Sequence, residues 1–560
     1  MAPNEEANQS ALFLSARIRI ARGLKTMRFV AALCISFASF LWSGSFGMAS
    51  VGEKPNIIYI LADDWGLGDV KTYGGDRCKI DTPHMDRLAE KGMKFTDAHT
   101  SSSVCTPSRY SILTGRYNWR SRLKGGVLQG FSEPLLEPGR ETVASLLKKN
   151  GYTTIMIGKW HLGMDFPTTD GKAVDKDGQN TDWKGRIKNG PTAAGFDKYW
   201  GISASLDMPP YIWIENDKFV GECTTQKAFP RKGPAHEDFE AVDVLPTLTK
   251  RAVAAITEEA KTGQPFFIYM PLNSPHSPTV PSKEFQGKSS LGLYGDFVME
   301  TDWAVGQVVE AVERAGIADH TLIIVTADNG CSNWPLKHNE VNDPARFKFR
   351  MGETQPDDPE AHYPSDIYRG HKADIYEGGH RVPFIARWDG QVKPGSVSSD
   401  PVCLVDLFAT CAEIVGAKPG DSTAEDSVSI LPDLLGKSTK PLREAVVHHS
   451  INGSFAIRQG KWKLAFCPDS GGWSNPVPPS GKKNAANAEP IKEWVQLFDL
   501  EADPAETKNL ASGHPDLVAR LTALAQRTID AGRSTPGAPQ KNNGKTFLYP
   551  HWIRENRQGI

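Results

Sequence analysis

The sequence predicts an α/β fold: a large, mostly parallel β-sheet sandwiched by helices, followed by a smaller C-terminal α+β domain that contains an antiparallel sheet. Short apolar runs alternate with stretches of helical spacing from Pro55 to Trp388, as in parallel sheets with helices on both faces. Beyond residue 440 the pattern changes to short strands separated by turn signals, and then to one amphipathic helix. A chain of 560 residues is also too long for one ordinary core, which indicates two domains.

The expected elements follow in chain order. Apolar runs with the length of buried strands are Asn56–Ala62, Thr153–Ile157, Phe266–Met270, Thr321–Thr326 and Val382–Trp388. Apolar residues at helical spacing predict helices over Thr142–Asn150, Val244–Thr262 and Tyr294–Ala315. The C-terminal part is expected to form strands at Val446–His449, Ser454–Arg458, Trp462–Phe466 and Val495–Asp499 and a helix at Asp516–Asp530. Two stretches rich in Gly, Pro, Asp and Lys are expected to form loops over a site, Asp165–Gly195 and Asn333–Pro364.

The N-terminus resembles an export signal. Lys25 and Arg28 precede an apolar run from Phe29 to Trp42, and small residues follow where a signal peptidase could cut. The run is shorter than the ~20 apolar residues that a membrane-spanning helix needs. We therefore expect an N-terminal extension and signal peptide over 1–49, a large domain over 50–440 and an α+β subdomain over 441–560. We also expect a secreted or periplasmic protein with no stable membrane span after signal cleavage.

Charge and cysteine content argue against several classes of protein. The formal net charge is −2 at pH 7, so no global field attracts nucleic acid, and we expect no nucleic-acid partner. The cysteines are scattered without Cys-x-x-Cys pairs, which argues against a structural zinc site and a disulfide-dense scaffold. Cys403 and Cys411 are expected to lie two turns apart on one helix, in the core.

Polar side chains follow the predicted strands at their carboxyl ends, where ligands bind in sheets of this kind. They are Asp63 and Asp64 after the first strand, Lys159 and His161 after the second, His276 after the third, and Asp328 and Asn329 after the fourth, with Lys372 before the fifth. Two adjacent aspartates alone could equally cap a loop. Four oxygen-bearing side chains without a nearby Cys or His ligand suit Ca²⁺ or Mg²⁺, and calcium tolerates irregular coordination better.

One further motif combines with these strand ends. Cys105-Thr-Pro-Ser-Arg109 is followed by Leu-Thr-Gly at 113–115, and the chain also contains GKWHLG at 158–163, GHK at 370–372 and EGGHRVP at 377–383. Cys105 by itself could be a buried structural thiol. Together the blocks resemble the formylglycine-dependent sulfatases, an arylsulfatase-like family of the alkaline phosphatase superfamily, from about Lys54 to Leu510. The resemblance implies a catalytic sulfatase domain over 50–440 and 3-oxoalanine (formylglycine) at position 105, made by a formylglycine-generating enzyme.

The resemblance also implies a role for each site residue. The divalent cation, calcium or alternatively Mg²⁺, would be held by Asp63, Asp64, Asp328, Asn329 and the oxidised side chain of Cys105. Arg109 would hold the hydrated aldehyde, and Lys159 and Lys372 would hold the sulfate oxygens. His161 would lie against the second hydroxyl of the hydrate, and His276 near the ester oxygen.

The chemistry of these groups agrees with the implied roles. A cysteine thiolate attacking a sulfate ester would leave a thiosulfate with no easy exit. A hydrated aldehyde can instead attack sulfur through one hydroxyl and expel sulfate when the second is deprotonated. His276 is the candidate acid for the leaving alcohol and His161 the candidate base. The cation and the two lysines would stabilise charge on the sulfate oxygens.

Two alternatives to a sulfuric ester hydrolase stay open. A phosphonate or phosphate ester hydrolase of the same superfamily would use the same groups. A non-catalytic, secreted glycan-binding protein would result if Cys105 were not oxidised, although a binding module needs no complete set of metal and acid–base residues. The expected substrate is a sulfated small molecule or glycan. A carbohydrate sulfate is favoured by export and by the polar and aromatic loop residues Asp207, Tyr211, Trp213, Arg231 and His236.

Overall fold

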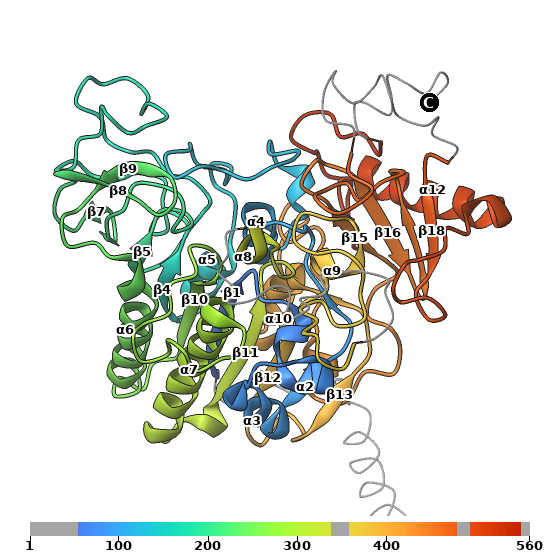
Figure 1. Cartoon of the computed structure of the whole chain (residues 1–560), viewed down its shortest axis with the longest axis horizontal. Coiled ribbons are helices and arrows are strands. Elements are labelled where there is room, and N and C mark those ends of the chain that lie inside the picture. The colour runs from blue at the N-terminus through green and yellow to red at the C-terminus, as the bar shows by residue number, and fades with distance from the viewer. Residues whose placement is uncertain (1–53, 338–357, 479–492, 550–560) are drawn as a thin grey trace, which may run out of the picture. The chain divides into compact units, whose positions relative to one another are not determined.

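A ten-stranded mixed sheet runs through the described part of the chain, residues 54–337, 358–478 and 493–549 of the computed structural model (Figure 1). Its strand order is β13-β2-β12-β11-β1-β10-β4-β5-β6-β7. The central strands run parallel to their neighbours: β11 (Thr321–Ala327), β1 (Asn56–Asp63), β10 (Phe266–Pro275), β4 (Thr153–Lys159) and β5 (Lys198–Ile202). Strand β1 is buried along its whole length, as expected for a strand covered on both faces. The predicted large, mostly parallel sheet is confirmed.

The outer strands change direction. Strand β12 (Phe384–Arg387) is antiparallel to β11 and to β2 (Met93–Phe95), while β13 (Ser396–Ser398) is parallel to β2. The opposite edge is closed by the antiparallel strands β6 (Ile214–Glu215) and β7 (Lys218–Phe219). Because β12 runs against the central strands, the chain that precedes it lies where those strands end. This reversal brings Lys372 to the carboxyl edge of the sheet.

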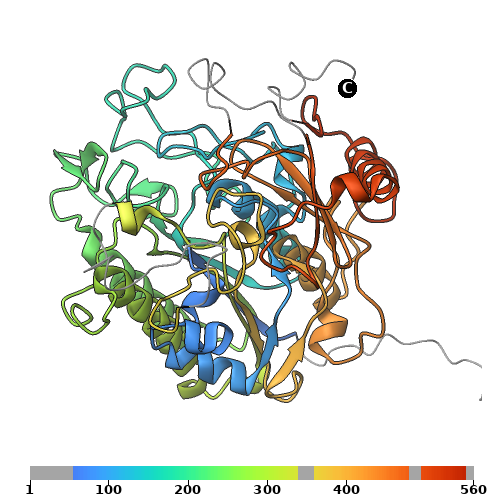
Figure 2. The same cartoon turned by 45° about the vertical axis from the view of Figure 1, so that its right-hand side comes forward.

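Helices cover both faces of the sheet (Figures 1 and 2). One group that packs together contains α3 (Pro83–Lys91), α6 (Val244–Glu259) and α7 (Gly292–Arg314), and a second contains α4 (Cys105–Thr114), α5 (Val143–Lys149) and α10 (Leu407–Ile414). Helix α5 begins at a capping box, in which the Thr142 side chain accepts a hydrogen bond from the backbone N–H of Ser145. The helices predicted at 142–150, 244–262 and 294–315 are confirmed to within three residues.

Short elements connect the main ones. They are the single helical turns α2 (Lys71–Gly74), α8 (Trp334–Lys337), α9 (Glu377–His380) and α11 (Leu431–Leu434), and the paired short strands β3 (Ala98–His99) with β14 (Val402–Cys403) and β8 (Thr225–Ala228) with β9 (Lys232–Ala235). Most of these short elements lie in segments for which the sequence predicted no regular structure.

The prediction that Cys403 and Cys411 share a helix is wrong. Cys403 ends strand β14, whereas Cys411 lies in α10. The Asp406 carboxylate accepts a hydrogen bond from the backbone N–H of Cys403 at 2.9 Å, so a tight 3₁₀ turn over Leu404–Asp406 comes between the two elements. Both cysteines are buried, as expected of core residues.

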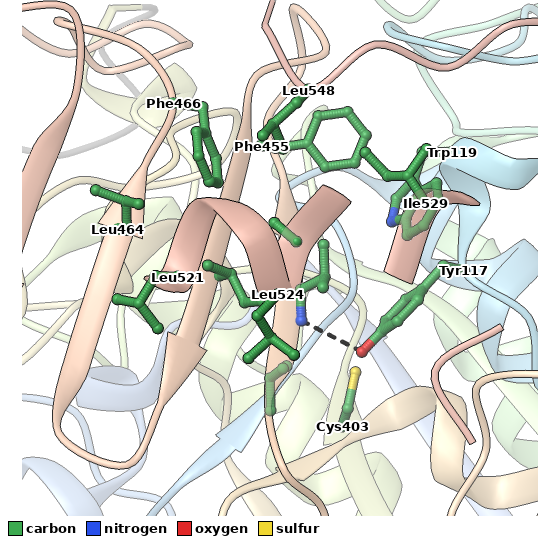
Figure 3. Close-up of a cluster of buried hydrophobic side chains, with 14 of the residues drawn as sticks. Tyr117, Trp119, Cys403, Phe455, Leu464, Phe466, Leu521, Leu524, Ile529 and Leu548 are labelled. Atoms are coloured by element: carbon green, nitrogen blue, oxygen red, sulfur yellow. Dashed lines mark hydrogen bonds between the residues drawn. The ribbon is translucent and has the colours of Figure 1, made fainter. Parts of the chain in front are cut away.

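A separate antiparallel sheet forms near the C-terminus. It contains β15 (Val446–His449), β16 (Phe455–Gln459), β17 (Trp462–Ala465) and β18 (Gln496–Asp499), against which α12 (Pro515–Asp530) packs. Figure 3 shows the core beneath it, where Tyr117 and Trp119, which follow α4 in the chain, lie among apolar side chains of the sheet and α12. The Tyr117 hydroxyl accepts a hydrogen bond from the backbone N–H of Val447 at 3.2 Å. The predicted antiparallel sheet and helix are confirmed, whereas the proposed domain boundary near residue 440 stays a prediction.

Among the described residues, no helix combines the length and hydropathy needed to cross a bilayer. The predicted signal peptide lies outside the described ranges.

Candidate active site

Cys105 is the first residue of α4 and is buried beneath the carboxyl edge of the sheet. Pro107 fits in the first turn of this helix, where backbone N–H groups have no intrahelical acceptor. Gly115 ends the helix in the left-handed conformation with φ 65°. Burial raises the pKa of the Cys105 thiol, although the nearby ammonium groups of Lys159 and Lys372 oppose the rise. As an unmodified cysteine it would therefore be a poor nucleophile at neutral pH.

Two carboxylates face Cys105. The Cys105 sulfur and one oxygen each of Asp63 and Asp328 all lie within 4.8 Å of one another. The Lys159 ammonium contacts Asp63 Oδ2 at 2.5 Å, and the Arg109 guanidinium contacts Asp328 Oδ2 at 2.7 Å. Burial alone would raise the pKa of Asp63, but the surrounding cations, Lys159 foremost, hold it well below its usual range. Asp63 is therefore ionised and available as a metal ligand.

Asp64 joins these groups to the loops that follow β11 and precede β12. Its backbone adopts the left-handed conformation with φ 65°, which is strained for a residue other than glycine. In this conformation its N–H donates to Asp328 Oδ1 at 3.2 Å. Its carboxylate accepts a hydrogen bond from Asn329 Nδ2 at 2.7 Å and contacts Lys372 Nζ at 2.6 Å. Six sequence-predicted residues thus meet around the two adjacent aspartates: Cys105, Arg109, Lys159, Asp328, Asn329 and Lys372.

The oxygen atoms at this centre fit a divalent cation. Asp63 Oδ1 and Asn329 Oδ1 are buried and have no hydrogen-bond partner among the described residues. Buried polar oxygens without partners are costly, and a hard cation would satisfy them. Asp63, Asp64, Asp328 and Asn329 supply three carboxylates and one amide, the hard oxygen donors that Ca²⁺ and Mg²⁺ prefer, and the Cys105 and His276 side chains lie beside them. The chemistry of the residues therefore agrees with a Ca²⁺- or Mg²⁺-type site.

Glycines allow the loop after β11 and the loop before β12, here called the two metal-side loops, to pack closely. The Gly330 N–H donates to Gly379 O at 3.0 Å, and the Lys372 N–H donates to Cys331 O at 2.8 Å. A Cβ atom added at Gly330 would lie 1.9 Å from Gly378 O, and one added at Gly378 would lie 2.2 Å from Gly370 O. Only glycine fits at such distances, so these residues fix the position of the Lys372 loop against Asp328 and Asn329.

The two candidate acid–base histidines differ in environment. His161 Nε2 donates to Leu128 O at 2.8 Å, which leaves Nδ1 as the unprotonated nitrogen, and Nδ1 has no hydrogen-bond partner in the described ranges. Burial and the charge of Lys159 lower the pKa of His161 well below its usual value, so the ring is neutral and able to accept a proton. His276 is more accessible, and its Nε2 lies 3.7 Å from Asp64 Oδ2.

A cavity of about 220 Å³ opens above these groups. Asp64, Cys105, His276 and Lys372 line it, together with Ser205, Asp207, Arg231, Trp334 and Trp473. Asp207 and Arg231 are the only two of the five predicted substrate-loop residues that line it. Tyr211 instead donates its hydroxyl proton to Arg231 O, Trp213 packs against Trp200 and Phe239, and His236 accepts a hydrogen bond from the backbone N–H of Asp238.

The predicted loops over the site are placed differently. No residue of the described segment 165–195 lines the cavity. Its Phe166 stacks with Phe219, and the Ile187 N–H donates to Asp217 O at 2.9 Å, so the segment packs on the edge strands β6 and β7. Trp334 from the second segment does line the cavity, while residues 338–357 lie outside the described ranges.

Ser205 and Trp473 are among the lining residues that sequence reasoning missed. Trp473 lies between β17 and β18, far along the chain from the strand ends. Its backbone N–H donates to Asp374 Oδ1 at 2.7 Å, two residues after Lys372. No local pattern signals this tertiary contact. Ser205 follows β5, whose short and only partly buried sequence KYWGI gave no strong apolar signal.

Comparison with known proteins identifies the family. The family model described as Sulfatase matches residues 55–417. The chain belongs to the sulfatase family. It is 33% identical over 527 residues to an N-acetylgalactosamine-6-O-sulfatase of Bacteroides thetaiotaomicron, covering 85% of this chain and 93% of that protein. It is 31% identical over 499 residues to human arylsulfatase A, covering 85% and 87%.

Solved structures agree with this membership. A structure from work on the metabolism of multiple glycosaminoglycans by Bacteroides thetaiotaomicron superposes with a TM-score of 0.70 at 31% identity, covering 85% of this sulfatase and 99% of that chain. The PsFucS1 sulfatase from Pseudoalteromonas sp. superposes with a TM-score of 0.64 at 24% identity, covering 91% of this chain and 94% of that one, and shares the fold. The sequence prediction of a sulfatase is confirmed.

Proposed function

We propose that this sulfatase removes sulfate from a sulfated carbohydrate, using formylglycine made from Cys105 and a divalent cation, Ca²⁺ in the first instance. The observation that carries the proposal is the position of Cys105. It lies at the start of a buried helix, within 4.8 Å of the carboxylates of Asp63 and Asp328, in a site that also contains Arg109, Lys159 and Lys372. A buried thiol has no need of such surroundings, whereas an oxidised side chain that binds an anionic sulfate ester and releases sulfate does.

Each residue of the site has a role in the proposed reaction that follows from its position. When hydrated, the aldehyde would supply one hydroxyl as nucleophile and a second whose deprotonation releases sulfate. Arg109 orients this side chain, and Lys159 and Lys372 face the sulfate oxygens as fixed point charges. The bound cation would add positive charge on the same oxygens. His276 lines the cavity and would give a proton to the leaving alcohol, and the free Nδ1 of His161 would accept the hydroxyl proton.

The carbohydrate part of the proposal rests on two lines of support. The bacterial relative that matches 93% of its own length is named for N-acetylgalactosamine-6-sulfate. The cavity is lined by two tryptophans and by polar side chains with free hydrogen-bonding capacity, a combination suited to sugar rings. Steryl-sulfatases and arylsulfatases also match the chain, so the choice of a sugar over other alcohols rests on the cavity.

Export and maturation complete the proposal. The apolar run at 29–42 would direct the chain to an extracytoplasmic compartment, and the Cys-Thr-Pro-Ser-Arg motif at 105–109 would be the substrate of a formylglycine-generating enzyme. Secretion would place the enzyme where polymeric sulfated glycans occur.

Release of free sulfate tests the proposed function. Wild-type protein made together with a formylglycine-generating enzyme is incubated with N-acetylgalactosamine-6-sulfate, 4-nitrophenyl sulfate and a phenyl phosphonate ester. We expect sulfate release from the sugar, loss of release after chelation, its return with Ca²⁺, and none in Cys105→Ala. Faster turnover of the phosphonate than of either sulfate would favour the rival hydrolase, and sugar binding without sulfate release would favour a binding protein.

A further inference from the structure

The segment that follows β5 forms one wall of the active-site cavity. It is held in place beside β4, because the Trp160 N–H donates to Ile202 O at 3.0 Å and the His161 N–H donates to Ser203 O at 2.9 Å. A Cβ atom added at Gly130 would lie 1.7 Å from Pro209 O, so the far end of the segment is also closely packed. The wall is therefore fixed before any ligand binds.

Two side chains of this wall have unused hydrogen-bonding capacity. Ser205 is 2% exposed and Asp207 is 8% exposed, and both line the cavity. Ser205 Oγ and Asp207 Oδ1 have no hydrogen-bond partner among the described residues. Buried polar atoms in folded proteins are almost always paired, so an unpaired hydroxyl and an unpaired carboxylate oxygen at one cavity wall indicate a polar ligand group.

Arg231 keeps Asp207 in place from the rim. Its Nη2 lies 3.4 Å from Asp207 Oδ2, and its Nη1 donates to Gln129 Oε1 at 3.0 Å. The guanidinium therefore occupies one carboxylate oxygen and leaves the other directed to a different partner. A carboxylate oxygen accepts hydrogen bonds and donates none, so its partner has to be a donor such as a hydroxyl or an amide N–H.

We propose that Ser205 and Asp207 form a hydroxyl-recognition subsite that binds a free hydroxyl of the same sugar ring that bears the sulfate ester. This inference rests on the proposed sulfatase function and specifies its substrate. A sulfated phenol has no such hydroxyl and would leave both buried groups unpaired. Sites built to pair with a ligand hydroxyl discriminate strongly against analogues that lack it. The subsite thus gives the enzyme its preference for sugar sulfates over aryl sulfates.

The test measures kcat/KM for N-acetylgalactosamine-6-sulfate and for 4-nitrophenyl sulfate in wild type, Ser205→Ala, Asp207→Ala and the control Asp238→Ala. Asp238 is exposed and does not line the cavity. We expect the ratio of sugar to aryl kcat/KM to fall by about tenfold in Ser205→Ala and by about tenfold to a hundredfold in Asp207→Ala, the range for neutral and charged hydrogen bonds. The control should keep the wild-type ratio.

Monodeoxy analogues of the sugar sulfate complete a double-mutant cycle. One analogue should have a low kcat/KM with the wild type. The kcat/KM of the same analogue should not fall further in Asp207→Ala. A ratio unchanged in both variants, or deoxy effects that add to the Asp207 effect, would overturn the subsite while leaving the sulfatase intact. Failure of the wild type to release sulfate from any ester would instead overturn the proposed function, and the subsite with it.

Discussion

Lys372 carries a permanent positive charge into the cavity. It is 6% exposed, and although burial alone would lower its pKa, the carboxylate of Asp64 raises it above its ordinary value. Its Nζ contacts Asp64 at 2.6 Å, so the ammonium is positioned before substrate binds. A charge fixed in this way costs no reorganisation when the sulfate oxygens gain charge.

We expect Lys372→Ala to lower kcat/KM for a sulfate ester by ~10²- to 10³-fold, the usual effect of removing one preorganised charge-stabilising group. The far-ultraviolet circular dichroism spectrum and the thermal midpoint should stay close to wild type. The exposed Lys393→Ala is the matched control. Turnover near the wild-type value in Lys372→Ala would contradict the assignment.

His276 can be tested through the leaving group. A sugar alkoxide is a far poorer leaving group than 4-nitrophenolate and needs a proton from a general acid. His276→Ala should therefore lower kcat/KM for the sugar sulfate by ~10²-fold or more and for 4-nitrophenyl sulfate by much less. His514→Ala, at an exposed position before α12, serves as the control. Equal losses on both esters would show that His276 binds substrate and does not act as the acid.

At the scale of elements, parallel strand ends were the most predictable part of the site. The residues at 63–64, 159–161, 276 and 328–329 were expected together because parallel strands end at one edge. The start of α4 at Cys105 was not expected, because Thr, Pro and Ser in its first turn have low helix propensity and no side-chain cap marks its start. Its helical form depends on tertiary packing under the sheet edge.

The cavity wall could not be predicted to the same extent. Asp207 and Arg231 were selected by residue type, but the same criterion selected Tyr211, Trp213 and His236, which pack elsewhere. Trp473 reaches the cavity only through folding of the C-terminal sheet against the Lys372 loop. Residue type indicates which chemistry a side chain can perform, whereas its position in the fold depends on contacts between distant segments.

The close packing of glycines within the Lys372 loop yields a prediction at this scale. A Cβ at Gly378 would lie 2.2 Å from Gly370 O, so Gly378→Ala forces the Lys372 loop to move. We expect the free energy of unfolding to fall by about 1–3 kcal/mol, as for other overpacked sites, together with a loss of turnover. Gly420→Ala is the control, since nothing lies within 4 Å of the added Cβ there. Equal urea midpoints for the two variants would contradict the packing argument.

Across the whole molecule, a buried ionic cluster joins the C-terminal sheet to the segment that carries Lys372. Lys463 on β17 contacts Glu377 at 3.1 Å and Glu506 at 2.8 Å. Next to them, His99 and His380 share a hydrogen bond of 3.1 Å between their Nδ1 atoms, and the rings of His380 and His448 stack at 3.7 Å. The cluster fixes β15 and β17 against α9, five residues from Lys372.

Removal of the central cation should be far more damaging than removal of a surface one. Lys463→Met leaves the buried Glu506 without its cation, while Glu377 keeps contacts with Arg381 and Arg458. Breaking a buried pair in this way typically costs about 3–5 kcal/mol. Urea denaturation measures the loss. Lys461→Met, on the same hairpin but with an exposed ion pair to Asp499, should change stability little. Similar effects of the two variants would show that the cluster does not hold the sheet in place.

The same cluster predicts acid sensitivity. Burial foremost lowers the pKa of His99, His380 and His448 below the value of about 6.5 expected in the unfolded chain. As the pH falls below that value, the unfolded chain binds imidazole protons that the folded protein does not, so the free energy of unfolding decreases, by up to about 1.4 kcal/mol per pH unit for each imidazole. Glu506 in the same cluster acts in the opposite direction, because burial raises its pKa to about 7 and the folded protein takes up its proton first, so the three imidazoles together outweigh it. Urea denaturation between pH 7.5 and 5 should show this slope, and His448→Gln should make it shallower. A free energy of unfolding that is constant over this range would exclude the effect.

The central claim is that residue 105 is oxidised in the active enzyme. The oxidised fraction can be measured and compared directly with the rate of turnover. Preparations made with different amounts of a formylglycine-generating enzyme are analysed by peptide mass spectrometry for the oxidised fraction of Cys105, and the rate of sulfate release is measured on each. We predict that the rate is proportional to the oxidised fraction and extrapolates to zero at zero oxidation. Full activity in a preparation whose residue 105 is entirely unmodified cysteine would contradict the proposed mechanism.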